Sequence, residues 1–327
     1  MSEAERPDPH RKDHAFLADG PHAVTHDEQI FSGALSFCRR KYARDLDGVD
    51  VAVVGVPYDQ ATSGRPGARF GPRAIREASS NLSWCRAWPS PFDPFEAMAV
   101  VDWGDVHIKH YDNASTPFAI QSAMATILAA GATPLMLGGD HYCSLPVMRA
   151  HAEKLGRPLA LVQFDSHSDT AQAAPQDIDH GTMFTQGVEG GVIDPDRSIQ
   201  VGIRTTYADH KGFEVYDAAK VHETGVAATA QAIRDRVGDA PVYLTFDIDG
   251  LDPAFAPGTG TPVIGGLATW QALAILRGLA GIDLRGMDVV EVAPAYDVGQ
   301  ITALAGATLA LQLLCLHAQR SGGPAAA

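Results

Sequence analysis

The chain has 327 residues, 46% of them hydrophobic and 20% charged, which is enough to bury a large core. Its formal net charge of −14 argues against nucleic acid and anionic membrane as partners. Four cysteines without CxxC spacing argue against a disulfide framework, and the polar first thirty residues are unlike a secretory signal peptide. The longest apolar run, 303–315, is shorter than a membrane span. We therefore expect a cytoplasmic protein.

Residues 1–29 are rich in Asp, Glu, His and Pro, which is typical of a flexible N-terminal arm. No linker rich in Pro, Ser or Gly divides the following chain, so we expect a single catalytic domain over 30–320. Residues 321–327 are expected to form a disordered tail.

The first element of the expected core is a strand over 51–56, a continuous β-branched run ended by Pro57. A glycine-rich loop, 62–72, follows, and it lacks the Gly-Lys-Ser/Thr ending of a phosphate loop. A short helix is expected over 73–79. Helix and strand patterns then alternate, which predicts a parallel sheet covered on both faces. Further helices are expected at 117–130, 145–155, 226–237, 268–279 and 301–319, and further strands at 134–137, 159–164, 198–203, 242–246 and 286–292.

Three of these strands lead into acidic or histidine side chains. Extended backbone points alternate side chains the same way, so the groups after one strand would face one point. In parallel sheets, ligands bind beyond the carboxyl ends of the strands, where all three sets would fall. The side chains expected to meet there are His141, Asp165, His167, Asp169, Asp247 and Asp249.

These six groups predict a metal site. Carboxylates and imidazoles at one point destabilise one another unless a cation lies between them. Four formal negative charges are more than one divalent ion neutralises, so the count indicates two metals bridged by carboxylates. Ligands of this kind, without thiolate, suit manganese, iron, cobalt or zinc and leave that choice open.

The motifs around the six residues carry a family resemblance. They are Gly-Gly-Asp-His at 138–141, Asp-x-His-x-Asp at 165–169, Asp-His-Gly-Thr-Met-Phe at 179–184, Asp-x-Asp at 247–249, Gly-Thr-Gly-Thr-Pro at 258–262 and Asp-Val-Val-Glu-Val-Ala-Pro at 288–294. The chain resembles the ureohydrolases, the dinuclear manganese enzymes that include arginase and agmatinase. The resemblance runs from about 51 to about 314, and its motifs are closest to those of the bacterial agmatinases.

The resemblance implies an arginase-like fold, a three-layer α/β/α sandwich with a mostly parallel sheet of about eight strands, assembled as a homo-oligomer, either trimer or hexamer. It also implies two manganese ions per subunit and a hydroxide between them that attacks the guanidinium carbon of a small cationic substrate. In the implied ligand arrangement, Asp165 and Asp247 bridge both ions, His141 and Asp169 complete one coordination sphere, and His167 and Asp249 complete the other.

The resemblance also implies roles in the reaction for three residues. Asp169 would orient the hydroxide and carry a proton onward. His180 would pass a proton to the leaving amine, because imidazole titrates near the working pH. Glu291 would bind the guanidinium through paired hydrogen bonds.

The loop 170–179 contains no basic residue, and its Asp177 and Asp179 would attract an ammonium tail and repel a carboxylate. We therefore expect hydrolysis of agmatine to putrescine and urea, although Arg65, Arg69 or Arg204 could approach the pocket from other loops. Alternatives are the same chemistry on 4-guanidinobutyrate or arginine, a zinc-dependent amide hydrolase or deacetylase, and an inactive homologue.

Overall fold

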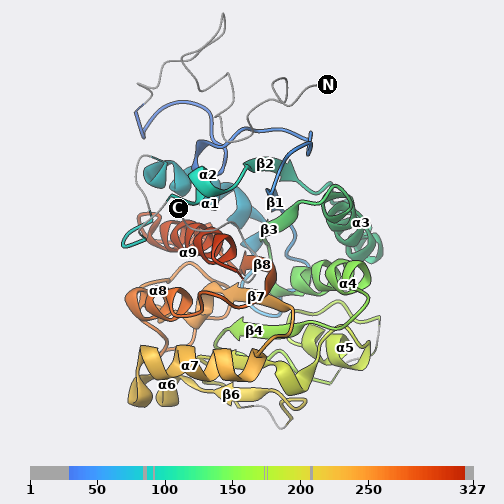
Figure 1. The fold of residues 1–327 in the computed structure, drawn as a ribbon, viewed down its shortest axis with the longest axis vertical. Helices are drawn as coiled ribbons and strands as arrows, with labels where there is room; N and C mark the ends of the chain where they lie inside the picture. The colour runs from blue at the N-terminus through green and yellow to red at the C-terminus, as the bar shows by residue number, and fades with distance from the viewer. Residues whose placement is uncertain are drawn as a thin grey trace, which may run out of the picture.

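An eight-stranded sheet, in which every strand pair is parallel, lies at the centre of the described residues (Figure 1). Its strand order is β2-β1-β3-β8-β7-β4-β5-β6. The strands are β1 (Val51–Gly55), β2 (Val100–Asp105), β3 (Thr133–Leu137), β4 (Ala160–Phe164), β5 (Ile199–Val201), β6 (Glu214–Tyr216), β7 (Val242–Asp247) and β8 (Leu284–Val290). The structure is a computed structural model that describes residues 29–83, 87–90, 93–172, 174, 176–206 and 209–320. The expected tail and all of the expected arm except Gln29 lie outside these ranges.

Helices cover both faces of the sheet (Figure 1). In β1, the side chains of Val51 and Val53 pack in one apolar cluster and those of Ala52 and Val54 in the other, which explains the uninterrupted apolar run. One cluster includes residues of α1, α7, α8 and α9, and the other includes residues of α3, α4 and α5. The expected three-layer sandwich is therefore confirmed. The helices are α1 (Gly71–Ser79), α2 (Pro94–Ala97), α3 (Thr116–Ala129), α4 (Ser144–Leu155), α5 (Met183–Glu189), α6 (Ala218–Thr224), α7 (Val226–Val237), α8 (Thr269–Arg277) and α9 (Ile301–Ala318).

Helix α9 is longer than the apolar run 303–315 on which the sequence argument relied. Its 18 residues and mean hydropathy of 1.7 would suffice for a membrane span by length and composition alone. However, 78% of the helix is buried within the fold, where residues such as Leu313 and Leu314 join the apolar cluster shared with α1 and α8. Packing in the domain core therefore accounts for its apolar composition.

Several short elements were not predicted from the pattern. The strand β2 contains Asp102, which is fully buried and pairs with Arg76 of α1 at 2.8 Å. This ion pair places charge inside the sheet and interrupts the apolar pattern. The strand β6 has three residues at the edge of the sheet, and α5 follows the turn 179–182 without a strong period of its own.

Two histidines far from the carboxyl edge are buried in the core. His151 of α4 lies against the ring of Tyr243, with 5.7 Å between ring centroids, and His317 of α9 lies 3.1 Å from the carbonyl oxygen of Leu284. Within the described residues, the Nε2 atom of each ring has no hydrogen-bond partner. Burial lowers the pKa of both side chains to about 3. Both rings are therefore neutral in the folded protein near neutral pH.

These two rings predict a loss of stability in mild acid. Their folded pKa values lie below the value of about 6.5 expected in the unfolded chain, so the unfolded state binds more protons as the pH falls below 6.5. Each histidine should lower the free energy of unfolding by about 1 kcal/mol between pH 6 and pH 5. Urea unfolding of chelator-treated protein measures this loss. His151→Met should show about 1 kcal/mol less of it than the wild type, and an unchanged pH dependence would contradict the assignment.

Candidate metal centre

The candidate site lies at the carboxyl ends of the four central strands. His141 follows β3, Asp165 follows β4, Asp247 ends β7 and Glu291 follows β8. These strands are consecutive in the order β3-β8-β7-β4, so residues far apart in sequence meet above the middle of the sheet. This is the edge at which parallel sheets bind ligands.

The glycines before His141 allow two loops to approach closely. A Cβ atom at Gly139 would lie 1.7 Å from the carbonyl oxygen of Tyr58, so only glycine fits there. The carbonyl oxygen of Gly139 also accepts the backbone N–H of Glu291 at 2.8 Å. The glycine therefore joins the loop after β3 to the loop after β8, and it brings His141 next to Glu291.

The sequence predicted that the side chains converge because the backbone is extended. In the structure they converge through turns. Residues 165–169 are not strand, and Asp169 has a left-handed φ of 52°, a conformation that costs energy for a residue other than glycine. Asp249 lies in the 3-10 turn Ile248–Gly250, where its N–H donates to Asp247 Oδ1 at 2.8 Å. The predicted residues do meet, but each meeting depends on a local bend.

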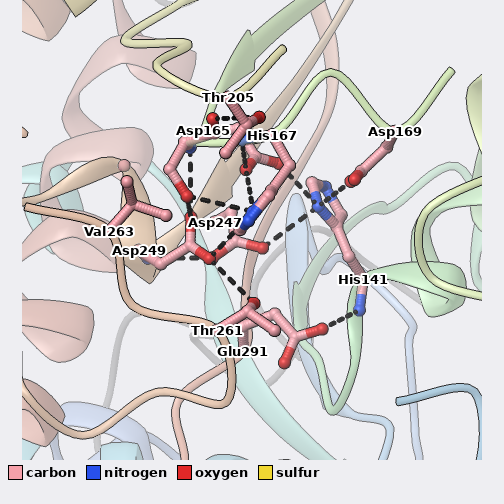
Figure 2. A network of polar contacts seen from close by, with 12 residues as sticks. His141, Asp165, His167, Asp169, Thr205, Asp247, Asp249, Thr261, Val263 and Glu291 are labelled. Carbon is pink, nitrogen blue, oxygen red and sulfur yellow. Dashed lines mark hydrogen bonds and ion pairs between the residues drawn. The ribbon is translucent and has the colours of Figure 1, made fainter. Parts of the chain in front are cut away.

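His141 is the centre of the first group of ligand atoms (Figure 2). Its Nδ1 atom lies 3.0 Å from Asp165 Oδ2, 2.9 Å from Asp169 Oδ2 and 3.2 Å from Asp247 Oδ2. The ring is 1% exposed, and Asp165 is fully buried. The ligand atoms of His141, Asp165 and Asp247 are close enough to hold one metal ion.

A second group adjoins the first and shares Asp165 with it. His167 Nδ1 lies 3.5 Å from Asp165 Oδ1 and 3.2 Å from Asp249 Oδ2. Asp165, His167 and Asp249 can also hold a metal ion. Because the two oxygens of Asp165 face different histidines, its carboxylate is placed to belong to both groups. Asp249 is fixed from outside the group by Ser166 Oγ at 2.7 Å. Thr261 Oγ1, at 3.1 Å, also holds it (Figure 2).

The donor set fits cations. His141 Nδ1 has no hydrogen-bond partner among the described residues, although three carboxylate oxygens surround it. Burial and the neighbouring carboxylates Asp249 and Asp165 raise the pKa of Asp247 well above its ordinary value. Burial and Asp165 likewise raise the pKa of Asp169 to about 7. A cation between these groups would favour the ionised form of the carboxylates, and the free Nδ1 atom of His141 could coordinate it.

Glu291 joins the metal centre to His180. It is 1% exposed and has a left-handed φ of 63°. Its Oε1 accepts the backbone N–H of His141 at 2.9 Å and lies 2.8 Å from His180 Nδ1. Its Oε2 has no hydrogen-bond partner within the described part of the chain. One oxygen therefore fixes the carboxylate, and the other retains its capacity to accept a hydrogen bond.

Ser63, which was not predicted as a site residue, contacts the other side of the His180 ring. Its backbone N–H donates to Nε2 at 2.9 Å, and its Oγ lies 2.7 Å from the same atom. A backbone N–H can only donate, so Nε2 accepts and Nδ1 carries the proton shared with Glu291. Burial lowers the pKa of His180, but contact with Glu291 outweighs it and raises the pKa to about 9. Protonation at Nε2 would break the contact with the Ser63 amide.

The three arginines left open by the sequence are occupied by protein acceptors. Arg204 Nη2 donates to the carbonyl oxygens of Asp249 at 2.6 Å and Val263 at 2.8 Å, which ties together two loops beside the metal centre. Arg69 pairs with Asp59 at 2.5 Å. Arg65 donates to the carbonyl oxygen of Thr259 at 2.6 Å and lies 4.3 Å from the centroid of the Tyr296 ring.

Asp177 and Asp179 serve local turns in the structure. Asp177 is exposed, and its Oδ2 accepts the backbone N–H of Ala174 at 2.8 Å. Asp179 Oδ1 accepts the backbone N–H of Gly181 at 2.8 Å, next to His180. Residues 173 and 175 of this loop lie outside the described residues. A substrate role for the two carboxylates stays a prediction.

A parallel sheet with helices on both faces therefore carries, at its carboxyl edge, a cluster of carboxylates and imidazoles that could hold metal ions. The model of the arginase family matches residues 49–315. Agmatinase of Chromobacterium violaceum is 53% identical over 290 residues, which is 88% of this chain and 90% of that protein.

Solved structures give the same result. A hypothetical agmatinase from Burkholderia thailandensis has a TM-score of 0.87 and 56% identity, covering 88% of this chain and 92% of that one. The proclavaminate amidino hydrolase of Streptomyces clavuligerus has a TM-score of 0.85 and 39% identity, covering 89% of this chain and 99% of that one. The chain belongs to the arginase family. It is a hydrolase that acts on guanidino compounds, in a family of binuclear metal-dependent enzymes.

The shared position of Asp165 predicts unequal effects of ligand substitutions. Asp165→Asn should remove metal from both groups, because the carboxylate oxygens face His141 and His167. Asp169→Asn, next to His141 alone, should remove metal from one. Elemental analysis of bound manganese per chain measures the difference, and Asp177→Asn in the exposed turn is the control. Equal losses in the two ligand variants would contradict the bridging role of Asp165.

Proposed function

We propose that this chain is an agmatinase, which hydrolyses agmatine to putrescine and urea with two manganese ions. The observation that carries the proposal is the buried Glu291, which lies next to the six-residue centre with one oxygen fixed and the other without a partner. The identity of about 50% to several bacterial agmatinases supports the substrate. When bound, the metal ions would supply Lewis acidity that lowers the pKa of a water toward neutrality.

We take the ligands of the two ions to be the predicted ones. Asp165 and Asp247 would be shared between both ions, His141 and Asp169 would hold one ion, and His167 and Asp249 would hold the other. The two observed groups share Asp165, and Asp247 lies in the group of His141, which supports this assignment for Asp165 most directly.

Glu291 would bind the guanidinium of the substrate. Its Oε2 is buried and free to accept a charge-assisted N–H bond, whereas Oε1 already accepts from His141 and faces His180. The resemblance implies paired hydrogen bonds to the guanidinium. In that arrangement, Oε1 would accept one of them in addition to the bond from the His141 amide. The carboxylate would thereby hold the guanidinium carbon in a fixed position over the metal centre.

His180 and Asp169 would handle protons. The leaving amine needs a proton as the carbon–nitrogen bond breaks. His180 is 8% exposed, and its Nε2 faces the exposed residue Ser63, so a proton can reach the ring from the solvent side. Asp169 would orient the attacking water through its second acceptor oxygen.

The tail of the substrate is argued from charge. Arg65 and Arg204 donate to backbone carbonyls and Arg69 pairs with Asp59, so each guanidinium already uses part of its donor capacity within the protein. The only charged residues of the loop 170–179 are the acids Asp177 and Asp179. An ammonium tail therefore finds a favourable potential, worth about 1 kcal/mol at a partly exposed site. This favours agmatine over arginine and 4-guanidinobutyrate.

A panel of guanidino substrates tests the proposed function. Manganese-loaded protein should release urea from agmatine with a higher kcat/KM than from arginine or 4-guanidinobutyrate, because agmatine alone of the three has an ammonium group and no carboxylate at its tail. Exhaustive chelation should abolish urea release, and added manganese should restore it. A higher kcat/KM for either carboxylate-bearing substrate would overturn the choice of agmatine while leaving the hydrolase class intact.

His180 should affect turnover and not metal binding. His180→Ala should lower kcat by about 10²–10⁴-fold, since proton transfer by a positioned side chain contributes this much. Bound manganese per chain should stay at the wild-type value, because His180 contacts Glu291 and Ser63 and not a predicted ligand side chain. Loss of manganese in this variant would move His180 into the coordination sphere and contradict its assignment.

A further inference from the structure

Asp288 is a buried carboxylate with no part in the chemistry described above. It lies in the middle of β8 and is fully buried. Burial raises its pKa, and electrostatic attraction to His141 and hydrogen bonds from Thr245, Tyr243 and Ser144 oppose that rise. Its Oδ2 accepts the hydroxyls of Ser144 at 2.7 Å and Tyr243 at 2.6 Å, and its Oδ1 accepts the hydroxyl of Thr245 at 2.5 Å. Three hydroxyl donors around one carboxyl group stabilise its ionised, acceptor-only form.

The register of the sheet places this carboxylate next to the metal centre. Thr245 of β7 is the cross-strand partner of Asp288, and Tyr243 lies two residues earlier on the same face of β7. Thr245 Oγ1 also lies 2.8 Å from His141 Nε2. A continuous chain of contacts therefore runs from Asp288 through the Thr245 hydroxyl to the imidazole of His141.

The direction of each hydrogen bond follows from the donors available. The Thr245 hydroxyl has one proton, which it donates to the Asp288 carboxylate. Toward His141, the same oxygen can then only accept, so Nε2 must carry the ring proton. The lone pair of the neutral ring is left on Nδ1, the atom that faces Asp165, Asp169 and Asp247 and has no hydrogen-bond partner in the described residues.

We propose that Asp288 and Thr245 are positioning residues that fix the tautomer of His141 and thereby make Nδ1 a metal ligand. The inference rests on the proposed metal centre. It concerns which nitrogen of the His141 ring carries the proton, and it leaves the set of proposed metal ligands unchanged. Outer partners of this kind usually change metal affinity by about 10–100-fold.

The substitution Asp288→Asn tests the direction of the hydrogen bonds that run from Asp288 through Thr245 to His141. An amide donating to Thr245 Oγ1 would turn the Thr245 hydroxyl toward His141 Nε2, and the ring proton would then occupy Nδ1. The manganese dissociation constant, measured by titration of metal-free full-length protein, should rise by about 10–100-fold. The matched controls Tyr243→Phe and Ser144→Ala each remove a hydroxyl from Oδ2 and leave the Thr245 contact intact. Their manganese affinity should stay close to that of the wild type.

A second pair of variants decides the question even if Asp288→Asn does not fold. Thr245→Val keeps the shape and removes the hydroxyl, so it should weaken manganese binding, whereas Thr245→Ser keeps the hydroxyl and should restore the affinity. In zinc-loaded wild-type protein with ¹⁵N-labelled histidine, NMR should show a protected Nε2–H for His141. That signal should be lost in Thr245→Val and retained in Thr245→Ser.

Two results would overturn the proposal. One is a manganese affinity equal to the wild type in Asp288→Asn or Thr245→Val. The other is a proton on Nδ1 of His141 in zinc-loaded wild-type protein. If substitution of each of the six predicted ligands removed manganese but Thr245→Val bound it normally, the proposed metal centre would be retained. Only the positioning role of Asp288 and Thr245 would be rejected.

Discussion

The repulsion between buried carboxylates is the constraint on which the rest of this structure depends. Asp165, Asp247 and Asp249 lie within the protein at 3% exposure or less, beside an imidazole nitrogen that has no hydrogen-bond donor to meet it in the described residues. Such a cluster is unstable in a low-dielectric interior without positive charge. The central strands and their tight loops hold it together, and metal ions would compensate the charge. The cluster that costs the fold stability is therefore the same cluster that forms the candidate metal site at the carboxyl edge of the sheet.

The sequence predicted most of this frame because its signals were local. Continuous apolar runs identified the central strands, and the helix expected over 226–237 has the bounds observed for α7. Signals that depend on partners were missed. The strand β2 contains the buried Asp102, whose charge is compensated only by Arg76 from α1. The convergence of the six candidate ligand residues was predicted, but the left-handed backbone of Asp169 and the turn at Asp249 were not, because both depend on the final packing.

The residues that support the site could not be identified from the sequence for the same reason. Thr245 is an ordinary strand residue until the register places it opposite Asp288. Ser63 belongs to the glycine-rich loop 62–72, which the sequence distinguished only from a phosphate loop, and its amide contacts the ring of His180. Arg204 ends a predicted strand, but the carbonyl groups it ties together belong to loops about 50 residues later in the chain. Each role is a relation between distant segments, and a one-residue shift in register would remove the first of them.

The residues proposed for the chemistry and those proposed for selectivity lie in different parts of the molecule. The predicted metal ligands and Glu291 come from the ends of adjacent central strands, where the packing of both helix layers fixes the backbone. The arginines near the site donate to backbone carbonyls or to Asp59, so their charge is used to hold loops in place. A carboxylate tail would have to compete with these internal acceptors, and breaking them would disturb the loops that carry Asp249 and Thr259. The proposed preference for a cationic tail therefore rests on the same contacts that hold the loops around the candidate metal centre.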